Sequence, residues 1–280
     1  MKKLRKRKVG IVQQIFVHGF LILASIVTAT PFFWMISTSF KTPQEIYTIP
    51  PKFIPSEITL KNYVDLFKGV NFGRPLLNTI IIALIAPPLS ILLNSMAGYA
   101  FSKFRFKGRE LLMLLILGTM MIPGQMTLIP TYLVVRFLNM LNTYRGIIIP
   151  GLVGAGSIFF WRQFIKGIPD EIIESAKIDG ANELLIYFKI ILPLSTPFLV
   201  TSFVFAFIGA WNAFLWPLIV ATDERMYTLP VAVSIIAGQY GENIGTILAG
   251  STLVVLPILI VFLIAQKYVI RGIAMTGLKF

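Results

Sequence analysis

The sequence contains no cysteine, a single histidine, His18, and few charged residues, which make up 13% of its 280 residues. The chain therefore forms no disulfide and has no thiolate or multi-histidine metal site. Soluble domains carry about 25% charged residues. Here 56% of the residues are hydrophobic and the mean hydropathy is +0.81, more than a soluble fold of this size can bury. The composition excludes a soluble enzyme, a disordered chain and a disulfide-stapled secreted domain, and indicates an all-α integral membrane protein.

Six windows are long and apolar enough to cross a bilayer as helices, which takes about 20 residues each. They cover residues 15–39, 77–101, 111–134, 144–162, 196–220 and 246–266. We therefore expect six transmembrane helices, some of them kinked at prolines. The windows lack Asp, Glu, Lys and Arg apart from Arg145 and Arg162, which lie at the two ends of the 144–162 window. This weighs against a proton relay, a voltage sensor or a charged ion filter.

The net charge of +13 is distributed unevenly along the chain. If the N-terminus is cytoplasmic, the cytoplasmic segments hold 17 of the 25 basic and six of the 12 acidic residues. The net charge is then +11 inside and +2 outside. The positive-inside rule predicts that both termini are cytoplasmic. The basic character thus reflects membrane topology, and we expect no nucleic-acid partner.

This topology predicts a single transmembrane domain over residues 1–280. Four segments lie outside the bilayer. They are a basic cytoplasmic N-terminus (1–14), an external segment (40–76), a cytoplasmic loop (165–193) and a cytoplasmic tail (267–280). The external segment is rich in turn residues, and we expect it to be irregular with one short helix near Leu60–Phe67.

The 165–193 loop has the pattern of two short helices joined by a turn. Asp170 and Glu171 suit the first turn of a helix because of its dipole. Gly180 suits the left-handed conformation that ends a helix. We expect a second helix that ends at Pro193 and whose apolar stripe comprises Leu184, Phe188, Ile191 and Leu192. The acidic residues of the loop favour a protein partner over an anionic lipid surface.

Within this loop Glu174-Ser175-Ala176 is followed after three residues by Gly180, and after nine more by Ile190-x-Leu192-Pro193. The pattern resembles the EAA loop of ABC importer permeases, with Ser175 in place of the first alanine. Other stretches resemble carbohydrate-uptake permeases, and they are Ala97–Phe106, Met121–Tyr132, Leu141–Gly146, Trp211–Leu218, Thr228–Pro230 and Gln266–Lys279. The likeness is greatest to the shorter, six-span permease of maltose-type systems.

The resemblance implies a multi-pass protein of the inner cell membrane that forms half of the pathway of a sugar or oligosaccharide importer. It implies a second permease subunit in a heterodimer, two ATPase subunits and an external solute-binding protein. The sequence has no phosphate-binding glycine loop, so we expect no enzymatic activity and no bound cofactor or metal, with ATP and Mg²⁺ on the ATPase. The residues that the resemblance assigns to ATPase coupling are Glu174, Ser175, Ala176, Asp179, Gly180, Ala181, Leu192 and Pro193.

Two other pairs of residues are weaker candidates. Gln239 and Tyr240 lie between glycines in an external connection and suit contact with a sugar-binding protein. Trp211 and Asn212 could line the pathway, although a buried asparagine also joins helices, and packing is favoured for Asn212. Three alternatives stay open: the same architecture importing a polyol or glycerol-phosphate ester, a stand-alone secondary transporter or channel, and a membrane scaffold.

Overall fold

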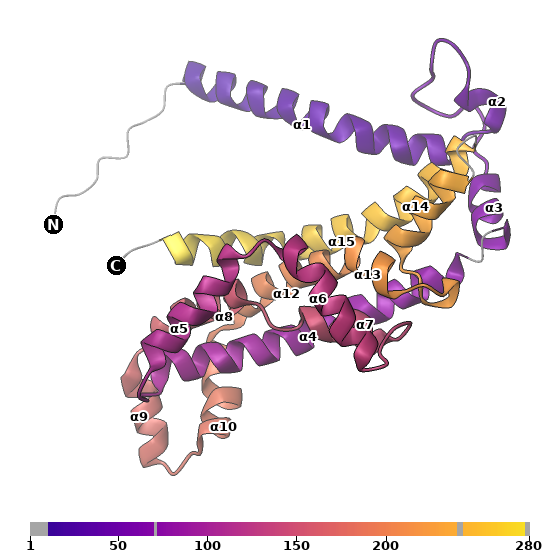
Figure 1. Cartoon of the computed structure of the whole chain (residues 1–280). Coiled ribbons are helices and arrows are strands. Elements are labelled where there is room, and N and C mark those ends of the chain that lie inside the picture. Colours follow the sequence, from indigo (N-terminus) through magenta and orange to yellow (C-terminus); the bar gives the residue numbers. More distant parts are fainter. Residues whose placement is uncertain (1–10, 70–71, 240–242, 278–280) are drawn as a thin grey trace. The chain divides into compact units, whose positions relative to one another are not determined.

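A computed structural model describes the backbone of residues 11–69, 72–239 and 243–277, and Figure 1 shows their helices. Within these ranges the ordered structure is entirely helical. The chain divides into two compact units. One unit is Met1–Val70 with Ile236–Thr252, and the other is Asn71–Ile235 with Leu253–Phe280.

The first unit contains α1 (Ile11–Ser39), α2 (Pro43–Ile46) and α3 (Lys61–Gly69). In α1 nearly all side chains before Trp34 are exposed and most of them are apolar, as expected for a helix that faces lipid. The short helix α3 matches the one expected in the external segment. The amide of Asn62, on α3, donates to the carbonyls of Ser39 and Lys41, which ties this segment to the end of α1.

The second unit contains most of the remaining helices. They are α4 (Gly73–Lys103), α5 (Arg109–Gly118), η1 (Thr119–Met121), α6 (Gly124–Phe137), α7 (Tyr144–Ile148), η2 (Ile149–Gly151), α8 (Ala155–Lys166), α9 (Asp170–Ile178), α10 (Glu183–Ile186), η3 (Tyr187–Ile191), α11 (Leu192–Leu194), α12 (Thr196–Trp211), α13 (Leu215–Val220) and η4 (Glu224–Met226). Two further helices are shared between the units, and they are α14 (Leu229–Gln239) and α15 (Ile244–Gly277).

Three helices, α1, α4 and α15, are long and apolar enough to cross a membrane unbroken. Three further candidate spans are bent helix pairs: α5 to α6 by 101°, α7 to α8 by 52°, and the helix ending at Leu194 to α12 by 82°. The expected window 196–220 is not one continuous helix, because α12 ends at Trp211 and α13 begins at Leu215. Pro217 has no N–H for the carbonyl of Ala213, which explains the break.

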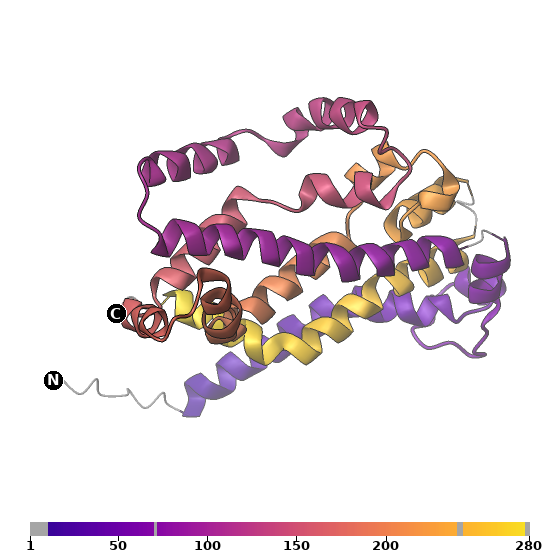
Figure 2. The ribbon, with the colours of Figure 1, turned by 90° about the horizontal axis from the view of Figure 1, so that it is seen from below.

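The helix α4 packs against α8 and α12 in the second unit, and Figure 2 shows it running beside α8. Gly98 allows the close approach to α8. A Cβ atom at this position would lie 2.6 Å from Cβ of Trp161 and 2.8 Å from the backbone nitrogen of Arg162. The contact therefore needs a residue without a side chain.

The connection between α13 and α15 contains the helix α14, which the sequence did not predict. The preceding turn is fixed by the ion pair between Asp223 and Arg225 at 2.6 Å. The hydrogen bonds from Arg225 lower the pKa of the Asp223 carboxyl to about 2. The amide of Asn78, in α4, donates to the carbonyls of Arg225 and Tyr227, so this turn is attached to α4.

Candidate functional site

The first helix of the 165–193 loop, α9, begins and ends as its sequence predicts. Asp170 and Glu171 occupy its first turn. At its end Gly180 has a φ of +82°. The Gly180 N–H donates to the carbonyl of Lys177 at 3.0 Å, and the N–H of the next residue, Ala181, donates to Ala176 at 2.9 Å. These two bonds form a Schellman motif, which closes the helix and turns the chain back.

The second half of the loop is helical but differs from the expected amphipathic α-helix. Asn182 caps α10, because its side-chain oxygen accepts from the N–H of Leu185 at 2.8 Å. The helix then widens into the π turn η3 and continues as α11 to Leu194. The helix thus ends one residue after Pro193, close to the expected end, and the chain bends by 82° into α12.

The π turn also changes which side chains of this helix are buried. Ile186 and Ile191, five residues apart, are both fully buried. A π turn closes its hydrogen bonds over five residues, so positions i and i+5 come onto one face. The predicted stripe is wrong for Leu184 and Phe188, which are 59% and 49% exposed.

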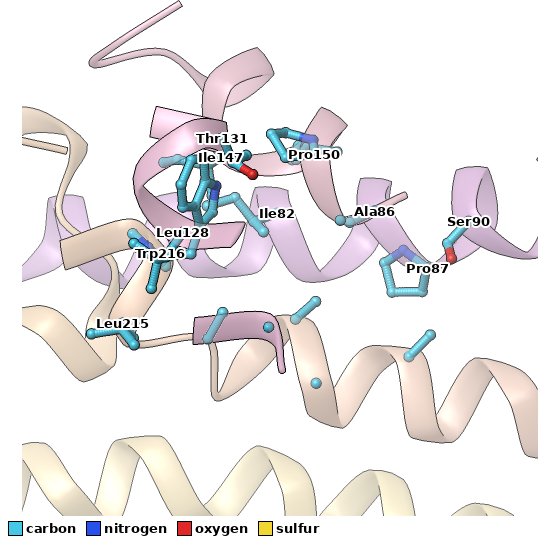
Figure 3. A pocket seen from close by; sticks show the side chains of 18 of the residues that line it. Ile82, Ala86, Pro87, Ser90, Leu128, Thr131, Ile147, Pro150, Leu215 and Trp216 are labelled. Carbon is cyan, nitrogen blue, oxygen red and sulfur yellow. The ribbon is translucent and has the colours of Figure 1, made fainter. Parts of the chain in front are cut away.

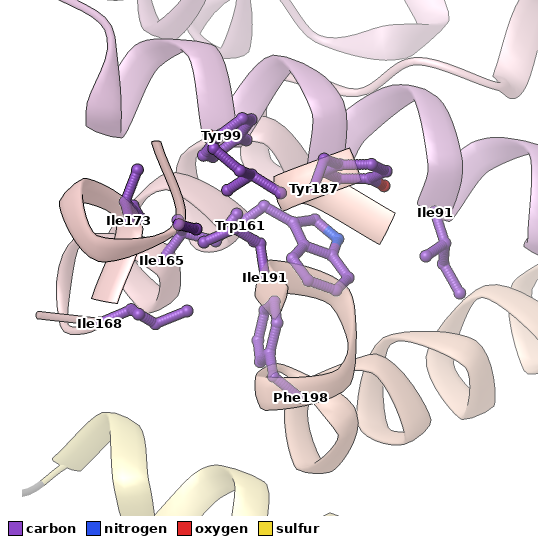
Figure 4. Close-up of a cluster of buried hydrophobic side chains, with 11 residues drawn as sticks. Ile91, Tyr99, Trp161, Ile165, Ile168, Ile173, Tyr187, Ile191 and Phe198 are labelled. Atoms are coloured by element: carbon purple, nitrogen blue, oxygen red, sulfur yellow. The ribbon is translucent and has the colours of Figure 1, made fainter. Parts of the chain in front are cut away.

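The loop rests on a buried apolar cluster that α4, α8 and α12 share with it. Figure 4 shows Tyr99, Trp161 and Phe198 of these helices around Tyr187 and Ile191 of the loop. The rings of Trp161 and Phe198 meet edge to face, with centroids 4.8 Å apart. Such close packing holds the loop against the helices as one body.

Three contacts between polar side chains join the loop to α4, and Lys103 Nζ also donates to the carbonyl of Ile168. The hydroxyls of Ser95 and Tyr187 are 2.7 Å apart, and the Tyr99 hydroxyl donates to Glu183 Oε2 at 2.8 Å. The third contact is an ion pair of 2.5 Å between Lys103 Nζ and Asp170 Oδ1. The hydrogen bond from the Lys103 ammonium lowers the pKa of the Asp170 carboxyl.

The residues that the sequence assigns to ATPase coupling lie on two sides of the loop. Glu174, Ser175, Asp179, Gly180 and Pro193 are exposed. The other three face inward or are half-buried, and they are Ala176, Ala181 and Leu192. Ile178 is the most exposed apolar side chain of the loop, at 86%. The outer face of α9 thus presents acidic, small and apolar groups together.

A cavity of about 670 Å³ opens between α4, α6, α12 and α13 (Figure 3). Its wall includes small residues from α12 and the polar residues Ser90, Gln125, Thr127 and Thr131. The Trp216 ring also lines it, and its N–H donates to the carbonyl of Gly146 at 3.1 Å. None of the described residues that line the cavity is charged.

The other predicted residues do not line this cavity. Trp211 is buried, and its N–H donates to the carbonyl of Val254, in α15, at 2.9 Å. Asn212 is an exposed residue at the end of α12. Gln239 is the last residue of α14, and Tyr240 lies outside the described residues. Among the described side chains, no group of three His, Cys, Asp or Glu could hold a metal.

Sequence reasoning missed the cavity residues and the α4 contacts. Ser95, Tyr99 and Lys103 are spaced four residues apart, which places them on one face of a helix. That spacing is visible in the sequence, but their partners lie 67 to 92 residues away.

Residues 88–275 match the family described as binding-protein-dependent transport system inner membrane component. The chain is 36% identical to the arabinooligosaccharides transport system permease protein AraQ of Halalkalibacterium halodurans, over 98% of this chain and 99% of that protein. It is 34% identical to the lactose transport system permease protein LacG of Rhizobium radiobacter, over 97% of each chain. It is 32% identical to the sn-glycerol-3-phosphate transport system permease protein UgpE of Pectobacterium atrosepticum, over 92% and 95%.

Two solved structures share the fold. One is a bacterial ABC transporter involved in the import of the acidic polysaccharide alginate, with a TM-score of 0.83 and 24% identity over 94% of this chain and 99% of that chain. The other is a bacterial alginate ABC transporter in complex with an alginate pentasaccharide-bound periplasmic protein, with a TM-score of 0.63 and 17% identity over 91% and 94%. The resemblance to importer permeases that the 165–193 loop indicated is confirmed. The chain belongs to the family of binding-protein-dependent transport system inner membrane components.

Proposed function

We propose that the chain is a transmembrane subunit of an ATP-driven, binding-protein-dependent importer that takes up a neutral sugar or oligosaccharide. The observation that carries the proposal is the 165–193 loop, an exposed helix pair that packs onto α4 and α12, two of the helices that line the cavity. Its relatives AraQ and LacG are named for arabinooligosaccharide and lactose transport.

The proposed topology has six spans with both termini in the cytoplasm of the inner membrane. It is supported by the three unbroken helices and three bent pairs, each long and apolar enough to cross once. The excess of basic residues in the segments assigned to the cytoplasm supports the orientation. In this orientation the 165–193 loop faces the cytoplasm, whereas the 40–76 segment and α14 face outward.

The proposed partner of the loop is an ATPase subunit, which would bind ATP and Mg²⁺. Glu174 is exposed and forms no ion pair with the described residues, so it is available to a basic group of the partner. Ile178 offers an apolar contact beside it. The Schellman turn at Gly180 fixes the angle at which both are presented. Two copies of the ATPase, a second permease and an external solute-binding protein complete the proposed assembly, with Gln239 and Tyr240 on the side of the binding protein.

The cavity favours a neutral solute over an anionic one. A phosphate or uronate buried in protein needs cationic or multiple N–H partners, because burying an unpaired charge is costly. The cavity instead offers Gln125, Thr127 and Thr131, together with the Trp216 ring, which suit hydroxyl groups and the apolar face of a sugar. This favours a saccharide over the glycerol-phosphate ester suggested by UgpE.

The proposal is tested with the chain reconstituted in liposomes with its second permease and ATPase subunits. With the binding protein outside and Mg-ATP on the ATPase side, we expect uptake of radiolabelled arabinotriose or lactose, and none of glycerol 3-phosphate. An ATPase variant that binds but does not hydrolyse ATP is the control, and it should abolish uptake. Uptake driven by an ion gradient without ATP would identify a secondary transporter, and uptake of glycerol 3-phosphate alone would identify the alternative solute.

A further inference from the structure

The 165–193 loop is linked by sequence to α8 and α12, yet its polar attachments are to α4. Ser95, Tyr99 and Lys103 form one stripe on α4 that spans about 12 Å of helix. Each contacts a different part of the loop, namely η3, α10 and α9 in that order. The loop is therefore held to α4 at both of its helices.

Tyr99 occupies the centre of this stripe. It is 96% buried, and its acceptor Glu183 also forms an ion pair of 2.6 Å with Lys177. Since Lys177 belongs to α9 and Glu183 to α10, the Tyr99 hydroxyl joins α4 to a bridge between the two loop helices. Movement of either helix is thus transmitted to the same point on α4.

The same helix continues into the wall of the cavity. Ser90, less than two turns before Ser95, is one of the residues that line it. Between them, Asn94 is fully buried and binds the break between α7 and α8. Its amide nitrogen donates to the carbonyl of Leu152 at 2.8 Å, and its oxygen accepts from the N–H of Gly154 at 3.0 Å. That break adjoins Pro150 and Gly151, which also line the cavity.

The part of α4 between these two sets of contacts contains no proline. The prolines inside the helix are Pro87 and Pro88, and both precede Ser90. Each lacks the N–H that would bond the carbonyl four residues earlier, so α4 is weakest there. The segment from Ser90 to Lys103 is continuous α-helix without a proline, so it can move as one body.

We propose that the 90–103 segment of α4 transmits movement of the 165–193 loop to the cavity wall. Tyr99 and Lys103 are positioning residues at the loop end, Asn94 is the positioning residue at the cavity end, and Pro87-Pro88 is the point about which the segment bends. The inference rests on the proposed function, because it takes the partner of the loop to be an ATPase.

The first test compares Tyr99→Phe with Tyr144→Phe in the complete transporter. Both variants remove one tyrosine hydroxyl that donates to a side chain across the α4 surface, since the Tyr144 hydroxyl donates to Asn78 Oδ1 at 2.7 Å. Only Tyr99 contacts the loop. We expect Tyr99→Phe to lower the number of arabinotriose molecules imported per ATP hydrolysed by roughly tenfold, the effect of one hydrogen bond to a charged acceptor. Tyr144→Phe should leave this ratio unchanged.

A double-mutant cycle with Glu183→Ala separates positioning from general destabilisation. If Tyr99 acts through Glu183, then Tyr99→Phe should have no further effect on the import-to-ATP ratio in the Glu183→Ala background. An unchanged ratio in Tyr99→Phe alone, or fully additive effects, would overturn the proposal. If the wild-type transporter imports saccharide by ATP hydrolysis and Tyr99→Phe has the same import-to-ATP ratio, the role of α4 is rejected. The proposed function stays intact in that case.

The second test measures a distance and needs no solute. Because the chain has no cysteine, spin labels can be placed by Leu93→Cys on α4 and Glu171→Cys on the loop. Both side chains are exposed. In the complete transporter we expect the same distance between the labels without nucleotide and with Mg-ATP. In the Tyr99→Phe background the distance should shift or broaden with Mg-ATP. A nucleotide-dependent change in the otherwise native chain, or none in Tyr99→Phe, would contradict the proposal.

Discussion

Replacing Gly180 by alanine tests whether the loop turn acts through its backbone conformation. Gly180 has a φ of +82°, which an L-residue adopts at a cost of about 1–2 kcal/mol. A Cβ atom added there meets nothing within 4 Å, so no clash inside the subunit contributes. The expected cost comes entirely from backbone strain. It shifts the equilibrium between the native turn and an unwound turn by a factor of about 5–30.

The matched variant is Gly180→Asn, because asparagine tolerates the left-handed region far better than alanine. In proteoliposomes containing the complete transporter, we expect Gly180→Ala to reduce ATP-driven saccharide uptake, and Gly180→Asn to retain most of it. Amounts of inserted subunit are compared by quantitative blotting. Equal uptake by Gly180→Ala and the native chain would refute the reasoning. Loss of uptake in both variants would show that side-chain size, rather than backbone strain, limits the contact.

Three further predictions concern other parts of the fold. Gly98→Ala should destabilise the subunit by about 1–3 kcal/mol, because the added methyl group overlaps Trp161 and the α8 backbone. The loss would be measured as a lower melting temperature in detergent. An unchanged melting temperature would disprove the close packing of α4 on α8. Trp211→Phe should cost about 1–3 kcal/mol in stability, because it loses the bond to Val254 and part of a buried ring that stacks on Phe207, but it should leave the apparent KM for saccharide uptake unchanged. A raised KM would place Trp211 in the pathway. The pKa of Asp223 is depressed from 3.8 to about 2, so its ion pair with Arg225 stabilises the fold above pH 4 and is lost as the pH falls toward 2. Asp223→Asn should therefore change the thermal stability by the same amount at pH 6 and pH 8. A different change at the two pH values would contradict this assignment.

Local chemistry made the first half of the loop predictable from the sequence. The acidic first turn of α9 and the left-handed Gly180 depend only on neighbouring backbone groups. The second half was not predictable, because a π turn moves Ile186 and Ile191 onto one buried face. Periodicity assumes 3.6 residues per turn and cannot detect a local widening of the helix.

The apolar windows coincide with apolar helices of the structure but do not show the breaks within them. Pro123 precedes α6 at one break, and Pro217 explains the interruption after Trp211. These prolines are evident in the sequence, whereas the bend angles depend on packing. The helix α14 was missed because its 11 residues are too few for a span. The α4 contacts depend on tertiary structure alone, since Tyr99 and Glu183 are 84 residues apart.

The most direct test of the central claim is photo-crosslinking from Ile178 in native membranes. This side chain is 86% exposed at the end of α9, where we propose that the ATPase binds. A photoreactive residue at position 178 should crosslink to the ATPase subunit, and the same residue at Ile54, which is 73% exposed in the external segment, should not. Crosslinking of the ATPase from position 54, or its absence from position 178 in an actively transporting complex, would contradict the proposed coupling and orientation.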